Sequence, residues 1–541
     1  MGSSDTEWGA FTDEGPWVLA PGDIAWKAGL REVRAQTRAS LPYLIRHRNL
    51  PPGARVGTTV RHLGGALGLW YLTERRRGGS VKIAGISRRL RIAAEQLGPT
   101  YIKLGQIVAS GDGIFPPELV TEFKSCRDQV PPEPWPVVEE VIAQELGRPP
   151  RAVFASIDHQ PLAAASIAQV HRAQLLDGTE VVIKVQRPSV VRRIHEDLAV
   201  MAWLAPHLVG RIPIAALANP PALVELFAET IVEELDFRLE AENMLDIAST
   251  FAVLGQRDFV VPRPHPTLVT RRMLVMERLS GFNFSDVDGM RAAGIDTDAV
   301  VRSGMIGFLE GAMMYGIFHG DLHGGNLFIL PSGKIALLDF GITARLSESK
   351  RLALLSLIVG ASNGDLAAQV AALRDLGALP ENTDVDTVIA QLGLDRPPVD
   401  PTTLTPDELV AELQRSIKTL LALGARMPKE LMLFVKNLVF LDGAIATLAP
   451  DLDLFGEIEA ISLMFAAKHG ERIMQQLGLE RDAEWKPDLS SVKAGFGLDE
   501  TAERLTHREI QAMRAQVRAT YGGRGRGSGR RPRPHRRRAP Q

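Results

Sequence analysis

The chain has 541 residues, of which 45% are hydrophobic and 23% charged, and its formal net charge is −2. This length allows two or three domains, and the composition is that of a globular protein rather than a disordered or fibrous one. The one cysteine, Cys126, excludes an internal disulfide and suits a reducing compartment. Residues 522–541 hold eight Arg and no acid, which leaves the rest of the chain distinctly acidic.

Hydropathy gives no sign of a secretory signal or of a membrane span. No segment reaches the roughly 18 uncharged apolar residues that a membrane helix needs. Residues 63–72, LGGALGLWYL, lie between Arg61 and residues 75–77, which are all Arg, so they could rest on an anionic membrane surface. An ordinary buried helix is the preferred interpretation. We expect a cytoplasmic protein, peripheral at the inner face of the membrane at most.

The predicted elements, in chain order, divide the sequence into six segments. A variable leader (1–83) precedes a helical segment (84–150). Within the next segment (151–281), strands are predicted over 152–185, with a hairpin signal at Asp177-Gly178. Helices are predicted at about 188–205 and 221–251, and two more strands, DFVVP and RRMLVMERL, follow. Residues 282–475 are mostly helical except for LFIL and KIALLDF, which predict a hairpin around 331–333. A helical segment (476–521) and a disordered Arg-rich tail (522–541) follow. We therefore predict an α+β, two-lobed, kinase-like fold.

Three side chains with metal-ligand chemistry lie in the apolar stretch HGDLHGGNLFILPSGKIALLDFG, residues 319–341. Asn326 follows Asp321 by five positions, and Asp339 follows Asn326 by thirteen. The predicted hairpin brings Asn326 and Asp339 to the same end of adjacent strands. Phosphoryl transfer needs one group to orient the nucleophile and oxygen ligands to hold Mg²⁺. The spacing indicates that Asp321 is the orienting group and that Asn326 and Asp339 are the metal ligands.

A cation for the phosphates is expected on the third strand of the small lobe. Lys184 is the only charge in VVIKV, and a lysine in a core strand needs a partner. The predicted helix ETIVEELDFRLEAEN would place Glu233, Asp236 and Glu240 on one stripe. We prefer Glu240 as the partner of Lys184, with Glu233, Glu234 and Asp236 facing another cation or a metal. A solvated acidic face is the alternative.

An Ala-rich loop precedes the second strand, where kinases have a glycine-rich loop over the phosphates. Alanines restrict positive φ and close backbone approach, so the loop should be stiff and hold nucleotide differently. The expected nucleotide-binding residues, together with Lys184, are Ala163, Ala164, Ala165, Ser166, Ile167 and Glu277.

At this point the sequence closely resembles the UbiB-type atypical kinases, the aarF/ADCK family. The matching motifs are ASIAQVH, VVIK, ELDFRLEAEN, HGDLHGGN, DFG and a KxGQ motif that includes Lys103, Gly105 and Gln106. The resemblance runs from about residue 85 to 455. It implies binding of ATP/ADP and Mg²⁺, with Asp321, Lys184 and Glu240 as catalytic residues.

The resemblance also implies a regulatory contact and a substrate class. Lys103 of the KxGQ helix would meet Glu234 and Asp236, and that helix would cover the place where a protein kinase docks its peptide. ATP hydrolysis, or action on a small hydrophobic lipid or quinone precursor, is then expected instead of protein phosphorylation. The chain after DFG runs straight into a helix, and Gly320 replaces an Arg that reads activation-loop phosphorylation, so a peptide kinase is also disfavoured by the residues.

Several alternatives stay open. Many bacterial members end in two membrane helices, whereas this sequence ends in a charged helix and the Arg-rich tail, so anchoring by a span is not expected. Gly324 stands where Pro is usual. An ATP-binding pseudokinase that regulates a membrane lipid pathway, and a small-molecule phosphotransferase of the aminoglycoside or choline kinase type, are the rival functions. The Arg-rich tail could bind an anionic membrane surface, with nucleic acid the less favoured partner, or serve only for solubility. Oligomerisation is undetermined.

Overall fold

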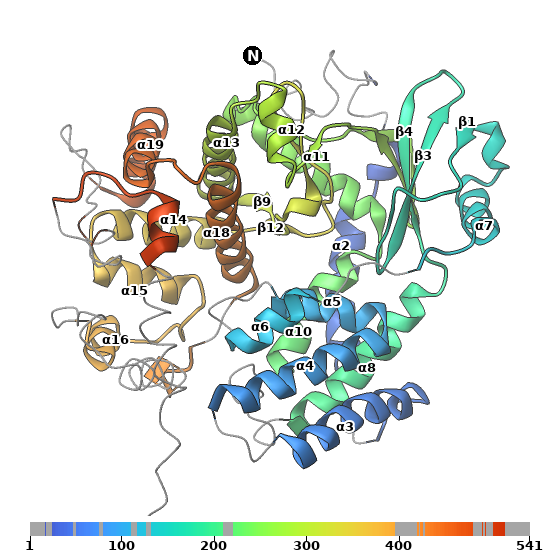
Figure 1. Ribbon diagram of the computed structural model, residues 1–541, viewed down its shortest axis with the longest axis horizontal. Helices are drawn as coiled ribbons and strands as arrows, with labels where there is room; N and C mark the ends of the chain where they lie inside the picture. The colour runs from blue at the N-terminus through green and yellow to red at the C-terminus, as the bar shows by residue number, and fades with distance from the viewer. Residues whose placement is uncertain are drawn as a thin grey trace, which may run out of the picture. The chain divides into compact units, whose positions relative to one another are not determined.

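The computed structural model describes residues 17, 24–46, 50–74, 79–109, 116–125, 131–208, 220–394, 419–420, 422–425, 428–479, 490, 493 and 501–513 (Figure 1). Cys126, the N-terminal leader up to Pro16 and the Arg-rich tail lie outside these residues. The chain forms two compact units. The first comprises residues 1–351 with 427–442, and the second comprises 352–426 with 443–541.

The first unit contains an antiparallel sheet in the order β1-β3-β4-β7-β6. Its strands are β1 (Phe154–Ile157), β3 (Ala168–Leu175), β4 (Glu180–Gln186), β6 (Pro264–Val269) and β7 (Met273–Glu277), and the short β2 (Ala163–Ala164) pairs with β3. The predicted hairpin is confirmed, since β3 and β4 pair across a turn in which Gly178 has a φ of 89°. Lys184 lies in β4, between β3 and β7.

Strand β6 is an element that the sequence did not predict. Its residues, PHPTLV, lie between the predicted strands DFVVP and RRMLVMERL and include two prolines, which cannot donate to a ladder. The strand lies at the edge of the sheet, where a missing donor is tolerated. Leu268 of β6 is buried and joins the core.

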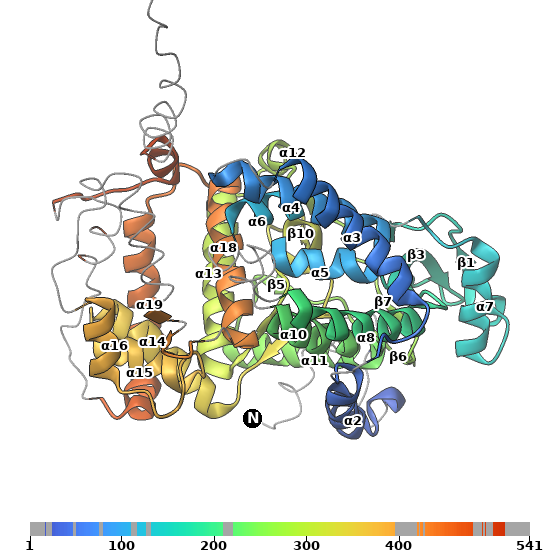
Figure 2. The same ribbon diagram turned by 90° about the horizontal axis from the view of Figure 1, so that it is seen from below.

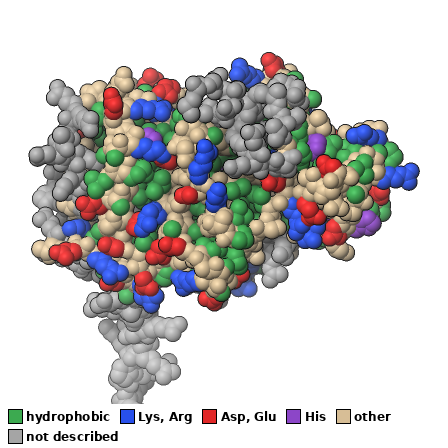
Figure 3. Space-filling view, turned by 90° about the horizontal axis from the view of Figure 1, so that it is seen from above, with side chains coloured by type: hydrophobic (Ala, Val, Ile, Leu, Met, Phe, Trp, Pro, Cys, Tyr) green, Lys and Arg blue, Asp and Glu red, His purple; other side chains and the backbone are tan. Residues whose placement is uncertain are grey.

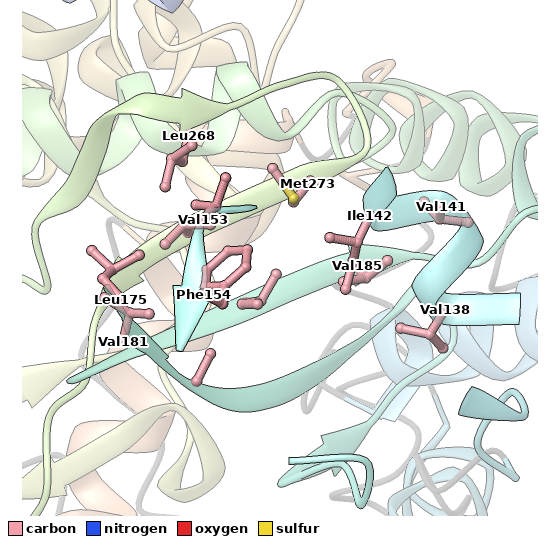
Figure 4. Packing of buried hydrophobic residues seen from close by; sticks show 13 residues of the cluster. Val138, Val141, Ile142, Val153, Phe154, Leu175, Val181, Val185, Leu268 and Met273 are labelled. Atoms are coloured by element: carbon pink, nitrogen blue, oxygen red, sulfur yellow. The ribbon is translucent and has the colours of Figure 1, made fainter. Parts of the chain in front are cut away.

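One face of this sheet packs against α7 (Trp135–Leu146), which follows the PPEP break (Figure 4). The core comprises 13 buried residues, and Figure 4 shows Val138, Val141 and Ile142 of α7 beside residues of the strands. Trp135 packs on the edge of this core. Because apolar residues alternate along the strands, one face of the sheet packs into this core, and that packing fixes the position of the strand that carries Lys184.

Several helices of the first unit lie beside the sheet, some before its strands in sequence and some after β4 (Figure 2). They are α2 (Leu30–Leu44), α3 (Arg55–Thr73), α4 (Gly79–Leu97), α5 (Pro99–Ala109), α6 (Pro117–Lys124), α8 (Val190–Leu208), α10 (Pro220–Glu233) and α11 (Phe237–Leu254), with the 3-10 turns η3 (Ala25–Lys27) and η4 (Pro150–Ala152). Helix α5 carries the KxGQ residues and contacts α4, α6 and α8. Helices α4, α5, α6 and α7 thus precede the small sheet in the sequence.

The single helix expected over 221–251 is wrong. Helix α10 ends at Glu233 and α11 begins at Phe237, because Asp236 has extended backbone and its carboxylate accepts the N–H of Arg238 as an N-cap. The carboxylates of Glu233, Asp236 and Glu240 consequently do not form one helical stripe.

The elements that carry or adjoin the stretch 319–341 lie in the same unit. They are β5 (Phe259–Val260), β8 (Phe282–Asn283), α12 (Val287–Ala292), α13 (Thr297–Glu310), a π-helical turn η5 (Gly311–Tyr315), β9 (Ile317–His319), the 3-10 turn η6 (Gly324–Asn326), β10 (Leu327–Ile329), β11 (Ile335–Leu337) and β12 (Thr343–Arg345). The hairpin predicted around residues 331–333 is confirmed, since Leu327 pairs with Leu337 and Ile329 with Ile335. Gly333, in the turn, has a φ of 80°, which only glycine adopts without strain.

Helix α18 (Lys429–Leu448) contributes its first part, up to Asp442, to the first unit. Among the described residues it is the one helix long and apolar enough to cross a membrane, and half of its most apolar window is buried within the protein. Its side chains Lys436 and Asn437 bind residues of the 319–322 loop, as a core helix would.

The second unit is helical in the part that the structure describes. It contains most of α14 (Glu348–Ser362), with α15 (Leu366–Asp375), α16 (Val385–Leu392) and α19 (Leu454–Leu477). Val370, Leu379 and Val388 form one small core, and Phe455, Leu505 and Ile510 form another.

The preferred interpretation of residues 63–72, a buried helix, is only partly right. They lie in α3, where Trp70 is buried but Leu69, Tyr71 and Leu72 are 53%, 55% and 81% exposed. Figure 3 shows a face of the molecule on which acidic and basic side chains are interspersed, with no field of one sign.

Candidate functional site

The loop after β9 holds the expected orienting Asp321. His319 N δ1 accepts the backbone N–H of Asp321 at 3.1 Å, and its Nε2 contacts the backbone oxygen of Asp339. Asn326, at the end of η6, donates from Nδ2 to the backbone oxygen of Asp321 at 3.1 Å. The amide of Asn326 is thereby fixed by its nitrogen, which leaves its oxygen to act as a ligand.

The β10–β11 hairpin joins Asn326 to the DFG segment. The backbone N–H of Leu338 donates to the backbone oxygen of Asn326 at 3.0 Å. Asp339 therefore directly follows a residue that is paired with Asn326. The carboxylate of Asp339 accepts the N–H of Gly341 at 2.9 Å and is 46% exposed. From α11, Asn243 donates to the backbone oxygen of Phe340 at 2.8 Å. The structure therefore brings Asn326 and Asp339 together.

Lys184 lies at the centre of the expected phosphate site. Its ammonium is 2.6 Å from Oε1 of Glu240 in α11 and 3.4 Å from Oδ1 of Asp339. Burial lowers the pKa of Lys184, but the carboxylates of Asp339 and Glu240 raise it more, so that the net shift is upward. Lys184 is therefore charged, and β4 holds its ammonium close to the carboxylates of Glu240 and Asp339.

Lys103 of the KxGQ helix reaches the same cluster. Its ammonium is 3.1 Å from Oε1 of Glu234, which lies between α10 and α11. Asp236, the other acid expected to meet Lys103, instead binds Arg238 at 2.7 Å. Glu233 binds Arg34 and Arg38. Each carboxylate of the segment therefore has its own cation, which relieves the repulsion that one stripe would create. Gly105 and Gln106 lie in the same helix, α5.

Sequence reasoning missed two residues of the site, both in α18. The ammonium of Lys436 forms an ion pair with Oδ1 of Asp321, and Asn437 donates to the backbone oxygen of His319. Asn437 also accepts the N–H of Leu322 at 3.2 Å and is fully buried. The signal was present in MPKELMLFVKNLVF: a lysine and an asparagine in the middle of an apolar helix require partners.

Charge in the site is nearly balanced. Burial raises the pKa of Asp321, but the ammonium groups of Lys436 and Lys103 lower it more, well below its usual range. Burial likewise raises the pKa of Asp339, while Lys184, Lys103 and the Gly341 hydrogen bond lower it to about 2. Both carboxylates are consequently ionised at neutral pH.

The Ala-rich loop is a tight hairpin rather than an open cradle. Ala163 and Ala164 pair with Val170 and Gln169, and Ala165 bonds to Ala168 at 2.9 Å. The loop is tied down by Arg187, whose Nε donates to the Ala165 oxygen at 3.0 Å.

Three of the expected nucleotide-binding residues have buried or ion-paired side chains. Ser166 and Ile167 are buried and line a cavity with residues of α5 and α8. Glu277, at the end of β7, pairs with Arg263 at 3.3 Å.

The segment after DFG is short, and strand pairing holds its backbone in place. Strand β12 begins at Thr343 and pairs with β9, with Thr343 opposite His319. A Cβ added at Gly320 would lie 2.7 Å from Cγ2 of Ile342, so no side chain fits there without movement. Arg345 binds Asn243 at 2.6 Å and also pairs with Asp246. The chain then enters α14 at Glu348, as expected.

These residues fit Mg²⁺ and a nucleotide. Among the described residues, no group of three or more His, Cys, Asp or Glu side chains could hold a metal alone. A cation here would share its coordination between Asp339, the Asn326 amide oxygen and phosphate oxygens, as Mg²⁺ does in phosphotransferases. A Lys–Glu pair, an Asn and Asp joined by a hairpin, and an orienting Asp together define a protein-kinase-like site.

Comparisons with known proteins give the family. Residues 125–373 match the ABC1 atypical kinase-like domain. An uncharacterised protein of Mycobacterium tuberculosis is 36% identical over 65% of this chain and 73% of its own length. A protein of Vibrio campbellii named "Probable protein kinase UbiB" is 31% identical over 68% of this chain and 69% of its own. The chain belongs to the ABC1 family of UbiB/aarF-type atypical kinase-like proteins.

A solved structure is also similar. The complex of a Mycobacterium tuberculosis protein with erythromycin matches 64% of this chain and 91% of its own, at 21% identity and a TM-score of 0.37.

Proposed function

We propose that this protein binds Mg-ATP in the site around Lys184 and Asp339, and couples its hydrolysis or phosphoryl transfer to quinone or prenyl-lipid metabolism. The observation that supports this most directly is the position of Lys184, whose ammonium lies within 3.4 Å of both Glu240 and Asp339. Phosphotransfer sites of this class need that arrangement.

Each residue has a distinct task in this proposal. Lys184 binds the phosphates and Glu240 orients it. Asn326 and Asp339 hold Mg²⁺, which when bound neutralises charge on the transferring phosphoryl group. Asp321 orients the attacking hydroxyl or water, and the backbone contacts of His319 and Asn437 fix its loop.

Peptide phosphorylation is not the proposed activity. Lys103, from a helix before the small sheet, already pairs with Glu234 beside the DFG glycine, where a Cβ on Gly341 would meet Glu234 at 3.3 Å. The short segment between Gly341 and α14 offers no extended platform for a peptide. A relative named "Probable protein kinase UbiB" and the motifs of that family support a small lipid or quinone precursor as the acceptor or activator.

The test is ATP turnover by the full chain, alone and with a panel of isoprenoid lipids and quinone precursors. Lys184→Ala and Asp339→Asn should each lower turnover by at least about a hundredfold. Asp298→Asn, an exposed acid at the start of α13, serves as the matched control and should leave turnover unchanged. If the wild-type protein hydrolyses ATP no faster than Asp339→Asn does, the proposal that the protein is an enzyme is wrong.

An ATP-binding pseudokinase is the second candidate, and one observation favours it. The carboxylate of Asp321 is held by the ammonium of Lys436, which competes with an incoming nucleophile. Nucleotide binding by calorimetry that depends on Lys184, without turnover under any lipid condition, would identify this function.

A further inference from the structure

A cavity lies in the first unit, behind the Ala-rich loop, and its lining includes neither Lys184 nor Asp339. It has a volume of about 110 Å³ and is bounded by the start of α5, the start of α8, α10 and the turn that follows β2. Its walls are mostly apolar, formed by the buried side chains Ile167, Val190, Ile194 and Ile231. Figure 2 shows α5, α8 and α10 side by side.

Thr100 supplies an unsatisfied polar group to this cavity. Its side chain is 2% exposed, and its hydroxyl has no hydrogen-bond partner within the described protein. Burying a hydroxyl without a partner is costly, and such groups are retained where a ligand or water binds. Ser166, also buried, is a second hydroxyl-bearing residue in the lining.

The electrostatics of the cavity favour an anion. Its lining includes Pro99 and Val190, the first residues of α5 and α8, and helix N-termini carry partial positive charge. Arg187 and Glu133 also line it and offset each other as an ion pair at 3.0 Å, and Arg187 donates as well to the backbone oxygens of Ala165 and Pro131. The exposed Arg193 is the cation that remains at the mouth.

We propose that this cavity binds a small organic anion, consisting of one phosphate or carboxylate group on a compact apolar body. The oxyanion would meet Arg193 and the two helix N-termini, and the body would rest on the isoleucines. The Thr100 hydroxyl would donate its hydrogen bond to the ligand. An apolar cavity of about 150 Å³ accommodates benzene, so the body is no larger than one ring.

Such a ligand would link two parts of the molecule that the candidate catalytic site uses. Thr100 lies in the helix that carries Lys103, and Ser166 and Ile167 belong to the Ala-rich loop. Binding would therefore hold α5 against that loop. The proposal does not depend on the proposed ATP chemistry.

Calorimetry and thermal shift on the full chain test the proposal, with phenyl phosphate and benzoate as the anionic probes. Neutral phenol and inorganic phosphate separate the apolar and anionic contributions. Saturable binding of phenyl phosphate or benzoate, at least about tenfold tighter than that of phenol and of inorganic phosphate, is expected. No saturable binding of either anionic probe, or equal binding of phenol, would overturn it.

Variants decide whether binding occurs in this cavity. Arg193→Gln should weaken the anionic probe by about tenfold or more, because hydrogen bonds to charged groups are the strong ones. Arg192→Gln, on the neighbouring and 79% exposed arginine of the same helix, should leave binding unchanged. Equal losses in both variants, or loss in Lys184→Ala with retention in Arg193→Gln, would contradict the proposal.

Thr100→Val distinguishes a role of the Thr100 hydroxyl in ligand binding from a role in the stability of the fold. It removes an unpaired buried hydroxyl, so the ligand-free protein should melt at the same or a higher temperature while the probe binds more weakly. A lower melting temperature combined with unchanged affinity would show that the hydroxyl serves the fold and not a ligand.

Discussion

Lys436 is the residue that most changes the interpretation of the site. It reaches Asp321 from α18, more than a hundred residues along the chain, and its partly buried ammonium is one of two that lower the pKa of that carboxylate. Spacing within residues 319–341 could not indicate it, because the contact depends on how α18 packs. The apolar run around Lys436 could have shown only that a partner was needed.

Replacing Lys436 by Met should destabilise the protein by about 1–3 kcal/mol, because Asp321 then keeps a buried charge with less compensation. Chemical denaturation measures this. In the double variant Lys436→Met/Asp321→Asn the loss should be smaller, since the charge is removed as well. A double variant less stable than Lys436→Met would show that the ion pair is not the origin of the effect.

His265 predicts a pH dependence of folding. Burial lowers its pKa to about 4, against a smaller opposing effect of Asp177. Its Nδ1 accepts the backbone N–H groups of Thr267 and Leu268, both at 3.2 Å, and a proton on that nitrogen would break both bonds. The folded pKa is below the unfolded value of about 6.5, so the stabilisation is present above that pH and is lost as the pH falls toward 4.

His265→Asn tests this, because its amide oxygen can accept the same N–H groups without titrating. Between pH 7 and pH 4 the free energy of unfolding should fall by about 2 kcal/mol more in the wild type than in the variant, allowing for solvent screening. Parallel pH profiles for the two proteins would exclude His265 as the cause.

At the scale of elements, the break between α10 and α11 organises the acidic segment. The N-cap at Asp236 turns Glu234 toward Lys103 and leaves Glu240, one turn into α11, to meet Lys184. One short stretch, residues 234–240, thereby supplies the carboxylate partners of two lysines, Lys103 and Lys184, which lie in separate elements.

The Lys103–Glu234 pair, which joins α5 to the end of α10, should show strong coupling. In a double-mutant cycle of Lys103→Met and Glu234→Gln, we expect about 1–3 kcal/mol, because both side chains are largely buried. The exposed pair Arg192–Glu196, at 3.5 Å on α8, is the control and should give at most about 0.5 kcal/mol. Similar coupling energies for the two pairs would show that burial adds nothing to the Lys103 contact.

The sequence predicted what depends on local patterns and missed what depends on packing. The β3–β4 and β10–β11 hairpins followed from alternation and turn glycines. Strand β6 did not, because its prolines exclude it from a sheet interior and only its place at an edge allows it. The helix break at Asp236 was overlooked because apolar periodicity continues through it, and a single capping carboxylate outweighs that pattern.

For the whole molecule, the exposed apolar side of α3 is the surface that bears on membrane association. Leu69 and Leu72 lie three residues apart, more than half exposed, and face the same side of the helix. If this side rests on an anionic membrane, Leu72→Glu should weaken sedimentation with anionic vesicles by about tenfold, the loss from one leucine side chain.

Leu366→Glu, on an exposed leucine of α15, is the control for that experiment and should leave sedimentation unchanged. Binding of Leu72→Glu equal to that of the wild type would remove α3 from the account of membrane association. Salt-sensitive binding that is retained in that variant would point to basic residues instead.

The pairing of β12 with β9 has a consequence for control. Many kinases assemble their Lys–Glu pair only after a phosphoryl group is attached to a long activation segment. Here the segment between Gly341 and α14 has two hydroxyl-bearing residues, Thr343, buried in the strand pair, and Ser347, which is exposed. Lys184 and Glu240 already touch in the unmodified chain. Because the Lys184–Glu240 pair forms without such a modification, we expect control of this protein to act on what enters the site and not on whether that pair forms.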